Sequence, residues 1–346
     1  KPSTMSLQNK IFFINTTFTK NIMRNCWQRR NCLIPESPIL SSNNFRYYSI
    51  SNSLMQSCLL TVINKADQIS GLPRNFSSAA KTAEKQIKVC GQEYPVDAMT
   101  NVTPKILSYL ERQLHRTPHH PLHHLKGRLV QFLYSRYTNA RGNPLFSVVD
   151  DLSPVVTVAQ NFDQLLVPKD HVCRRNQDNY FINSQHLLRA HTSAHQSELI
   201  QSGLDNFVVV GDVYRRDEIN STHYPVFHQM EGVKLYTAEQ LLPKSSPSPA
   251  AVLSGEPSTG PTVACNNSPQ AAHTAAAVTA LTQELQSCLA DMATHIFGKD
   301  IECRWVDAHF PFTQPSWELE VLWQGQWLEV LGCGIIQQRI IEQAGV

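Results

Sequence analysis

The sequence has no run of 18 or more apolar residues, no Cys-x-x-Cys pair and no secretory signal pattern. The first absence excludes a membrane-spanning helix, so we expect no membrane partner. The other two argue against a disulfide framework and a thiolate zinc site, and we interpret the nine cysteines as reduced thiols. The formal charge of +2 does not by itself indicate a nucleic-acid partner.

Acidic residues are scarce in the first 80 positions, where Glu36 and Asp67 stand against nine lysines and arginines. Together with many serines and asparagines, this composition is typical of a mitochondrial transit segment. We predict that residues 1–80 are a disordered leader, that Met55 is the initiator, and that the cleavable signal runs from there to Ala80. The alternative is a disordered tail that carries no address.

Two helices are predicted near the start of the ordered part. Thr103 can cap the first, and residues 122–137 form the second. Five histidines lie between them, which invites a metal-site interpretation. No carboxylate or thiolate is spaced to complete a ligand shell, and Pro118 and Pro121 favour a helix-helix connector.

Strands dominate from Phe146 onward. We predict them at residues 155–158, 206–215, 232–236, 303–309, 317–323 and 327–331. Strands and helices do not alternate regularly, which favours an α+β fold, with a mostly antiparallel sheet flanked by helices, over a doubly wound parallel sheet. Residues 241–274, rich in Ser, Pro, Gly, Ala and Thr, predict a disordered insertion, and residues 275–297 predict an amphipathic helix that covers the sheet.

The most informative stretch is Gly211-Asp-Val-Tyr-Arg-Arg-Asp217, followed ten residues later by Phe227-His-Gln-Met-Glu-Gly232. We interpret the two segments as the strands of an antiparallel hairpin with a long loop. Such a hairpin can aim an arginine and a carboxylate into one pocket. The planar fork of arginine matches phosphate oxygens, and a glutamate on the neighbouring strand can hold an ammonium group.

Five motifs occur in the order found in one known family. They are Asn161-Phe-Asp-Gln-Leu165, Leu188-Arg-Ala-His-Thr-Ser-Ala-His-Gln196, the hairpin, Phe310-Pro-Phe-Thr-Gln-Pro-Ser316 and Trp327-Leu-Glu-Val-Leu-Gly-Cys-Gly334. Together they resemble the catalytic domain of the phenylalanine-tRNA synthetase family, in its single-chain mitochondrial branch, and hence a class II aminoacyl-tRNA synthetase. The resemblance runs from about Gly91 to the last residue with one interruption, which is far more specific than a single short pattern.

The resemblance implies the nucleotide end of a site. Arg215 would be the catalytic residue at the α-phosphate of ATP, where positive charge must neutralise the developing negative charge. Asp217 would recognise the adenine amino group, and Thr222, His223 and Tyr224 would form the loop that closes over the nucleotide. The alternative for Arg215 is a surface strand arginine paired with Asp217.

The resemblance also implies a phenylalanine pocket. Its residues would be His191, Ser193, Ala194, His195, Gln196, Gln229, Met230, Glu231, Phe310, Phe312, Glu329, Gly332 and Gly334. Gln229 and Glu231 alternate on one face of a strand and can meet one ligand together. Phe310 and Phe312 would pack edge to face on a phenyl ring, or else be ordinary core residues, and His191 and His195 taken alone would be core or capping residues.

The implied function is the ATP-dependent activation of L-phenylalanine to phenylalanyl adenylate and its transfer to the 2′ hydroxyl of tRNA(Phe), by a monomer in the mitochondrial matrix. Mg²⁺ should bridge the ATP phosphates, with Glu318 or Glu320 as candidates for steering it, and no metal ligand is assigned. The alternative is a catalytically inactive synthetase-like fragment that binds ATP, phenylalanine or a protein partner. Another adenylate-forming ligase is a third possibility, which the two phenylalanines disfavour.

The chain departs from the family pattern at two places. His171-Val172 stands where the family usually has His-Pro. The sequence also stops at Val346, before the third motif with its second ATP-binding arginine and before the small anticodon-binding domain. We therefore expect residues 81–346 to be an incomplete class II catalytic domain and to show no aminoacylation alone.

Overall fold

The computed structural model describes residues 13–16, 85–220, 223–241 and 269–346, which all belong to one compact unit. Most of the predicted insertion and nearly all of the predicted leader fall outside these ranges, as does Thr222, so those expectations stay predictions. Within the two segments, residues 13–16 are described as a strand, and Gln270 is described as a buried residue that donates to the Ile336 carbonyl at 3.0 Å. No helix in the described ranges is long and apolar enough to cross a membrane.

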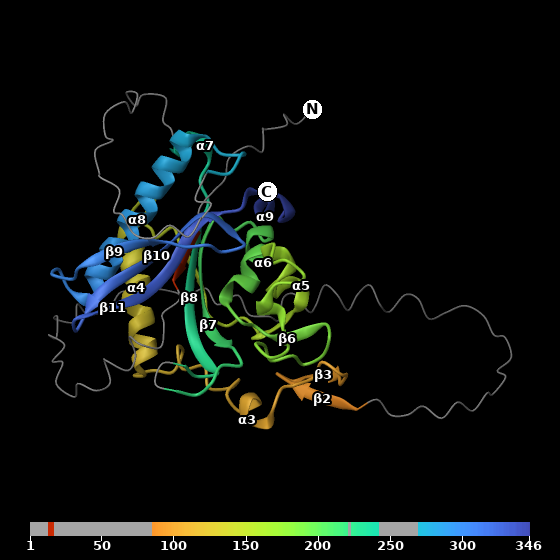
Figure 1. The fold of residues 1–346 in the computed structure, drawn as a ribbon. Helices are drawn as coiled ribbons and strands as arrows, with labels where there is room; N and C mark the ends of the chain where they lie inside the picture. The colour runs from red at the N-terminus through yellow and green to blue at the C-terminus, as the bar shows by residue number, and fades with distance from the viewer. Residues whose placement is uncertain (1–12, 17–84, 221–222, 242–268) are drawn as a thin grey trace, which may run out of the picture. The chain divides into compact units, whose positions relative to one another are not determined.

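Helices and strands alternate irregularly along the chain (Figure 1). The helices are α3 (Pro104–Leu107), α4 (Pro121–Arg136), α5 (Val158–Asn161), α6 (Gln196–Gln201), α7 (Ala238–Leu241), α8 (Ala275–Phe297) and α9 (Gln338–Gln343), with short 3-10 turns η1 (Asp163–Leu165), η2 (Val172–Arg174) and η3 (Thr192–His195). The strands are β1 (Phe13–Thr16), β2 (Gln86–Val89), β3 (Gln92–Pro95), β4 (Ser147–Val149), β5 (Val155–Thr157), β6 (His186–Leu188), β7 (Asn206–Tyr214), β8 (Val226–Lys234), β9 (Cys303–Asp307), β10 (Thr313–Trp323) and β11 (Gln326–Ile336).

Seven strands form the main sheet, in the order β4-β7-β8-β1-β11-β10-β9. Only β4 and β7 pair in parallel, and every other neighbouring pair of this sheet is antiparallel. The pairs β2-β3 and β5-β6 are separate two-stranded sheets. The predicted α+β class with a mostly antiparallel sheet is therefore confirmed.

Each face of the sheet has its own apolar cluster. On one face, Val208 and Val210 of β7 and Met230 of β8 pack with α4 and α8. On the other, Phe207 and Val209 pack with α6 and α9. Successive residues of a strand point to opposite faces, which is why neighbours on β7 belong to different clusters. On the second face, this cluster lies at the Phe207 end of the hairpin, and Gln229 and Glu231 lie farther along the same face.

The long helix α8 spans the residues predicted for it. Thr274 caps its first turn by accepting a hydrogen bond from Ala277, and its apolar stripe, including Leu281, Leu285 and Met292, is buried against the sheet. The helix predicted at Thr103 is a single turn, although Thr103 does cap it. The histidine-rich segment is a connector, as predicted, in which the side chain of His120 caps α4.

The predicted antiparallel hairpin is present. β8 begins at Val226, one residue before the Phe227–Gly232 segment and six before the strand predicted at 232–236, because its pairing with β7 continues to Tyr214 opposite Val226. The return from β10 to β11 is a tight turn at Gln324 and Gly325, both with positive φ, as two-residue hairpin turns require. An unexpected element is β1, drawn in red in Figure 1, which lies between β8 and β11.

Candidate active site

The floor of the site is formed by Gln229 and Glu231, two residues apart on β8 and therefore on one face of it. The turn η3 lies over them. The Thr192 amide donates to Gln229 Oε1 at 3.1 Å, and the hydroxyls of Thr192 and Ser193 donate to Glu231 Oε2 at 3.0 and 2.6 Å. Four side chains from two distant segments are thus fixed relative to one another.

Glu231 carries an unusual carboxylate. It is 0% exposed, and its second oxygen, Oε1, has no hydrogen-bond partner in the described part of the chain. Burial raises its pKa to about 7, and the hydroxyls of Ser193 and Thr192 offset only part of that rise. A buried carboxylate with one free oxygen is a binding position for a cation that can donate hydrogen bonds.

Other buried polar atoms gather in the same segment. Both polar atoms of the Gln196 side chain and Nδ1 of His191 lack partners among the described residues. Burial, with the charge of Arg215, lowers the pKa of His191 to about 3, so its ring is neutral. Because buried polar groups are normally satisfied, such a concentration of free ones indicates a place for a polar ligand.

An aromatic wall stands across the sheet from Glu231. The rings of Phe310 and Phe312 are stacked, with centroids 5.8 Å apart and an interplanar angle of 12°. Phe310 lies on Gly332, where a Cβ would come within 2.7 Å of its ring. Gly334 is equally crowded, by the Pro315 carbonyl and the Thr313 side chain. Both glycines are therefore needed for close approach of the wall to β11.

The wall and the floor lie on the same face. Cys333 packs in the cluster with α4 and α8, so Gly332 and Gly334 point the other way, as Glu231 does. β1 separates β8 from β11, which places the two rows about 10 Å apart, two strand spacings. Ala194 and Phe312 join one apolar cluster. The space between carboxylate and rings suits a small molecule with an ammonium group and an apolar side chain.

Arg215 lies just beyond β7 on the same face. Its Nε donates to the Ala190 carbonyl at 3.0 Å, and its guanidinium carbon is 5.1 Å from the centre of the Phe227 ring. Burial lowers its pKa, while Asp217 and Glu329 act in the opposite direction. The structure thus brings Arg215 near two predicted site residues, Asp217 and Glu329. Its neighbour Arg216 bonds elsewhere, to the Asn176 carbonyl.

Three predicted residues are placed apart from this pocket. The side chain of Met230 belongs to the core on the opposite face, because it sits between Gln229 and Glu231 on an alternating strand. The Tyr224 hydroxyl shares a hydrogen bond with Tyr109, whose ring packs in a cluster on the opposite face of the hairpin. The His223 ring and amide both meet the Asn220 side chain, within the exposed loop.

Comparison with known proteins settles the family. The model of the tRNA synthetases class II core domain (F) matches residues 108–241 and 274–346. The chain belongs to this class II synthetase family. Residues 242–273, between the matched segments, include most of the predicted insertion.

Relatives of the class II core also share long stretches of sequence with the chain. A probable mitochondrial phenylalanine--tRNA ligase of Drosophila melanogaster is 51% identical over 75% of this chain and 59% of that protein. The mitochondrial phenylalanine--tRNA ligase of Rattus norvegicus is 47% identical over 75% and 54%. The chloroplastic/mitochondrial enzyme of Arabidopsis thaliana is 44% identical over 72% and 50%. The chain spans between half and three fifths of these relatives.

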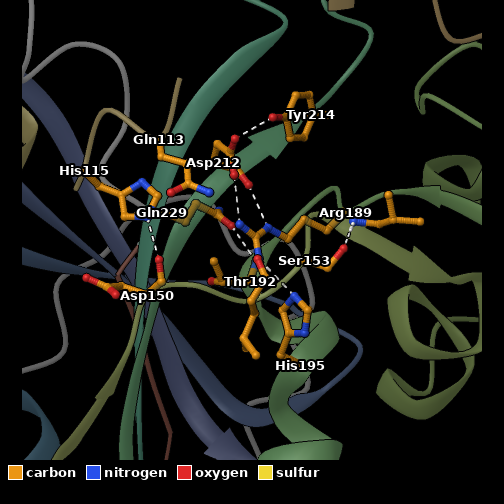
Figure 2. A network of polar contacts seen from close by, with 12 residues as sticks. Gln113, His115, Asp150, Ser153, Arg189, Thr192, His195, Asp212, Tyr214 and Gln229 are labelled. Carbon is orange, nitrogen blue, oxygen red and sulfur yellow. Dashed lines mark hydrogen bonds and ion pairs between the residues drawn. The ribbon is translucent and has the colours of Figure 1, made fainter. Parts of the chain in front are cut away.

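Sequence reasoning missed the buried polar core of this synthetase site. Arg189, 2% exposed, contacts Asp212 and His195 (Figure 2). Thr192 bonds to both Gln229 and Glu231. The motif Leu188–Gln196 contains Arg189 and Thr192, but its sequence alone predicts no role for either residue. One signal was present: a glycine inside a strand, Gly211, marks a place where another group approaches the backbone closely.

Carboxylates gather beside Arg215 in this synthetase core. The pKa of Glu318 is raised by burial and by the charges of Glu329 and Glu320. The pKa of Glu329 is raised by burial and by Glu320, and lowered by Arg215. Glu320 itself pairs with Arg304. Within the described ranges, no group of three or more ligand side chains is arranged to hold a metal ion.

Proposed function

We propose that this class II core activates L-phenylalanine with ATP and transfers it to tRNA(Phe) in the mitochondrial matrix. The observation that carries the proposal is the pairing of a buried, half-satisfied Glu231 carboxylate with the Phe310 and Phe312 wall across one sheet face. The relatives named above, which are phenylalanine--tRNA ligases of mitochondria, support the substrate and the compartment.

At the amino-acid end, the ammonium group would be held by Glu231 Oε1 and by Gln229, whose other bonds are already made to η3. Charge-assisted hydrogen bonds of this kind are roughly twice as strong as neutral ones. The phenyl ring would enter between the aromatic wall and the cluster that contains Ala194. Gln196 and His191 hold further buried polar atoms that are free to meet the substrate.

At the nucleotide end, Arg215 would neutralise the α-phosphate as the substrate carboxylate attacks it, and Asp217 would contact the adenine. ATP is a substrate here, and Mg²⁺ would travel with its phosphates. Burial and the charges of neighbouring carboxylates raise the pKa values of Glu318 and Glu329, and that charge repulsion favours a cation beside them, so these two carboxylates would steer the magnesium-bound phosphates. The protein would act as a monomer.

The test is amino-acid-dependent exchange of pyrophosphate into ATP, across a panel of the standard amino acids, by a protein that carries this chain together with the family's third motif and C-terminal domain. We expect exchange with phenylalanine well above every other amino acid. Charging of mitochondrial tRNA(Phe) would then establish the second step, and tRNA(Tyr) serves as the control.

Two outcomes would contradict the proposal. Strongest exchange with an amino acid other than phenylalanine would show that another ligase uses this pocket. Calorimetric binding of phenylalanine or ATP without any exchange would favour the alternative, a synthetase-like chain that binds its ligands and does not turn them over.

A further inference from the structure

Arg189 is among the largest fully buried side chains in the described part of the chain. It leaves β6 and crosses to β7, where its Nε donates to the Asp212 carbonyl at 2.7 Å and its Nη2 to the Asp212 carboxylate at 2.9 Å (Figure 2). Tyr214 donates to the other oxygen of the same carboxylate. A buried guanidinium is stable only when it is paired and its donors are satisfied, and Asp212 provides that pairing.

The third guanidinium nitrogen, Nη1, contacts the segment that contains η3. Nη1 lies 3.0 Å from Nε2 of His195 and 3.3 Å from the Leu152 carbonyl. Arginine can only donate, so His195 Nε2 must accept. The His195 ring is therefore neutral with its proton on Nδ1. Burial lowers the pKa of His195, the Glu198 carboxylate opposes that change and the charge of Arg189 adds to it, so the ring stays neutral and the bond from Arg189 selects the tautomer.

Arg189 also fixes the opposite end of the same segment. Its carbonyl accepts a hydrogen bond from the Tyr214 amide at 2.9 Å, and its amide donates to the Pro154 carbonyl at 2.8 Å. The backbone of Arg189 thus anchors the start of η3 while its side chain anchors His195 at the end. Between these anchors lie Thr192 and Ser193, the hydroxyls that meet Glu231.

Gly211 makes space for this arrangement. A Cβ at position 211 would lie 2.0 Å from Arg189 Nη2 and 2.7 Å from its Cζ. The guanidinium is hydrogen-bonded to Asp212 and His195, so it cannot move away from position 211 without breaking those bonds. The backbone at Gly211 is ordinary strand, which means that close approach alone explains the glycine.

We propose that Arg189 is a positioning residue for the amino-acid pocket, acting through His195 and η3 on the orientation of Thr192 and Ser193. The inference rests on the proposed function, because it assigns the pocket to phenylalanine. Without the guanidinium bonds of Arg189, η3 is less ordered, so Thr192 and Ser193 no longer hold Gln229 and Glu231 in place. The substrate must then order these side chains when it binds, which lowers its affinity. Arg215 meets this segment at the backbone carbonyl of Ala190, which a change of the Arg189 side chain leaves in place, so ATP affinity should depend on the connection far less than phenylalanine affinity does.

The test compares Arg189→Lys, Gly211→Ala, the double variant and Arg136→Lys in the full chain. Lysine keeps the charge of Arg189 but cannot make the fork. Arg136 pairs with Asp291 between α4 and α8, away from the pocket, and serves as the control for a lost ion pair. Calorimetry with L-phenylalanine and with ATP gives both affinities, and thermal unfolding gives the stability of each variant.

We expect Arg189→Lys and Gly211→Ala each to weaken phenylalanine binding at least tenfold, with ATP affinity within twofold. The loss of phenylalanine affinity in the double variant should be smaller than the product of the two single losses, because both substitutions disturb the same guanidinium contacts. Arg136→Lys should leave phenylalanine affinity within twofold. Wild-type phenylalanine affinity in both single variants would overturn the proposal, and so would equal losses for phenylalanine and ATP.

A second measurement does not require any ligand. Nitrogen-15 spectra of the histidine rings should show His195 as the neutral Nδ1–H form in the wild type and a changed tautomer balance in Arg189→Lys. An unaltered His195 signal would refute the connection even if phenylalanine binding failed for other reasons. Failure of the wild type to bind phenylalanine, with the His195 change present, would count against the proposed function and leave the Arg189 connection standing.

Discussion

The two ends of the site are built differently. At the amino-acid end, Thr192, Ser193, Gln229 and Glu231 are all at most 2% exposed and bonded to one another. In the loop that is proposed to close over the nucleotide, Tyr224 is 38% exposed and His223 meets Asn220 within the loop itself. A small rigid ligand is recognised best by a pocket fixed beforehand, whereas a long flexible one can be enclosed by a loop that moves onto it.

The largest loss of activity is expected on changing Arg215, whose position is already fixed by its hydrogen bond to the Ala190 carbonyl. Changing Arg215 to Ala should lower pyrophosphate exchange by about 10² or more, because the α-phosphate loses its preorganised charge in the transition state. Phenylalanine affinity, measured by calorimetry, should change far less. Exchange at the wild-type rate would show that Arg215 is not the catalytic residue.

The selectivity between phenylalanine and its hydroxylated analogues tests the apolar wall of the pocket. A wall formed by Phe310 and Phe312 has little means of refusing a substrate that adds only a hydroxyl, and apolar sites discriminate by about 10² in such cases. We expect detectable activation of tyrosine and meta-tyrosine. Discrimination beyond about 10⁵ in kcat/KM would require a polar rejecting group in the pocket.

The carboxylate at the pocket floor gives a pH-dependent prediction. Because the pKa of Glu231 is raised to about 7 in the free protein, protonation below that pH removes the partner of the substrate ammonium. Phenylalanine affinity should therefore fall by up to about tenfold per unit as the pH drops below 7, and level off above it. Calorimetry from pH 5.5 to 8.5 measures this.

Changing Glu231 to Gln supplies the matched control for that pH series. It should weaken phenylalanine binding by roughly tenfold at pH 8, the scale of one charge-assisted hydrogen bond, and abolish the pH dependence. ATP affinity should be unchanged. A fall in ATP affinity with phenylalanine affinity intact would mean that the two ends of the site are reversed.

The smallest effect is expected in the exposed loop. Changing Tyr224 to Phe removes one hydrogen bond, to Tyr109, at a partly solvated position. Thermal unfolding should report a stability change within about 0.5 kcal/mol. An exchange rate lowered more than tenfold would show that the loop closes with the Tyr224 hydroxyl on the nucleotide.

The sequence predicted the parts of the molecule that local pattern determines. Periodicity located α8 to the residue, and strand alternation placed Gln229 and Glu231 on one face. The same alternation, applied to every residue of the motif, would have assigned Met230 to the core. Sequence alone could not reveal the role of Arg189, because that role depends on contacts with Leu152 and Asp212, which are 37 and 23 positions away.

The place of β1 has a consequence for the order in which the sheet assembles. Its partners β8 and β11 lie roughly 200 and 300 positions farther along the chain, whereas β7-β8 and β10-β11 are hairpins of neighbouring segments. Loop-closure entropy makes distant pairings form slowly, so the two hairpins should form first and their junction last. The pairings of β1 in the middle of the sheet, next to Glu231, should therefore form last during folding and be lost first in denaturant.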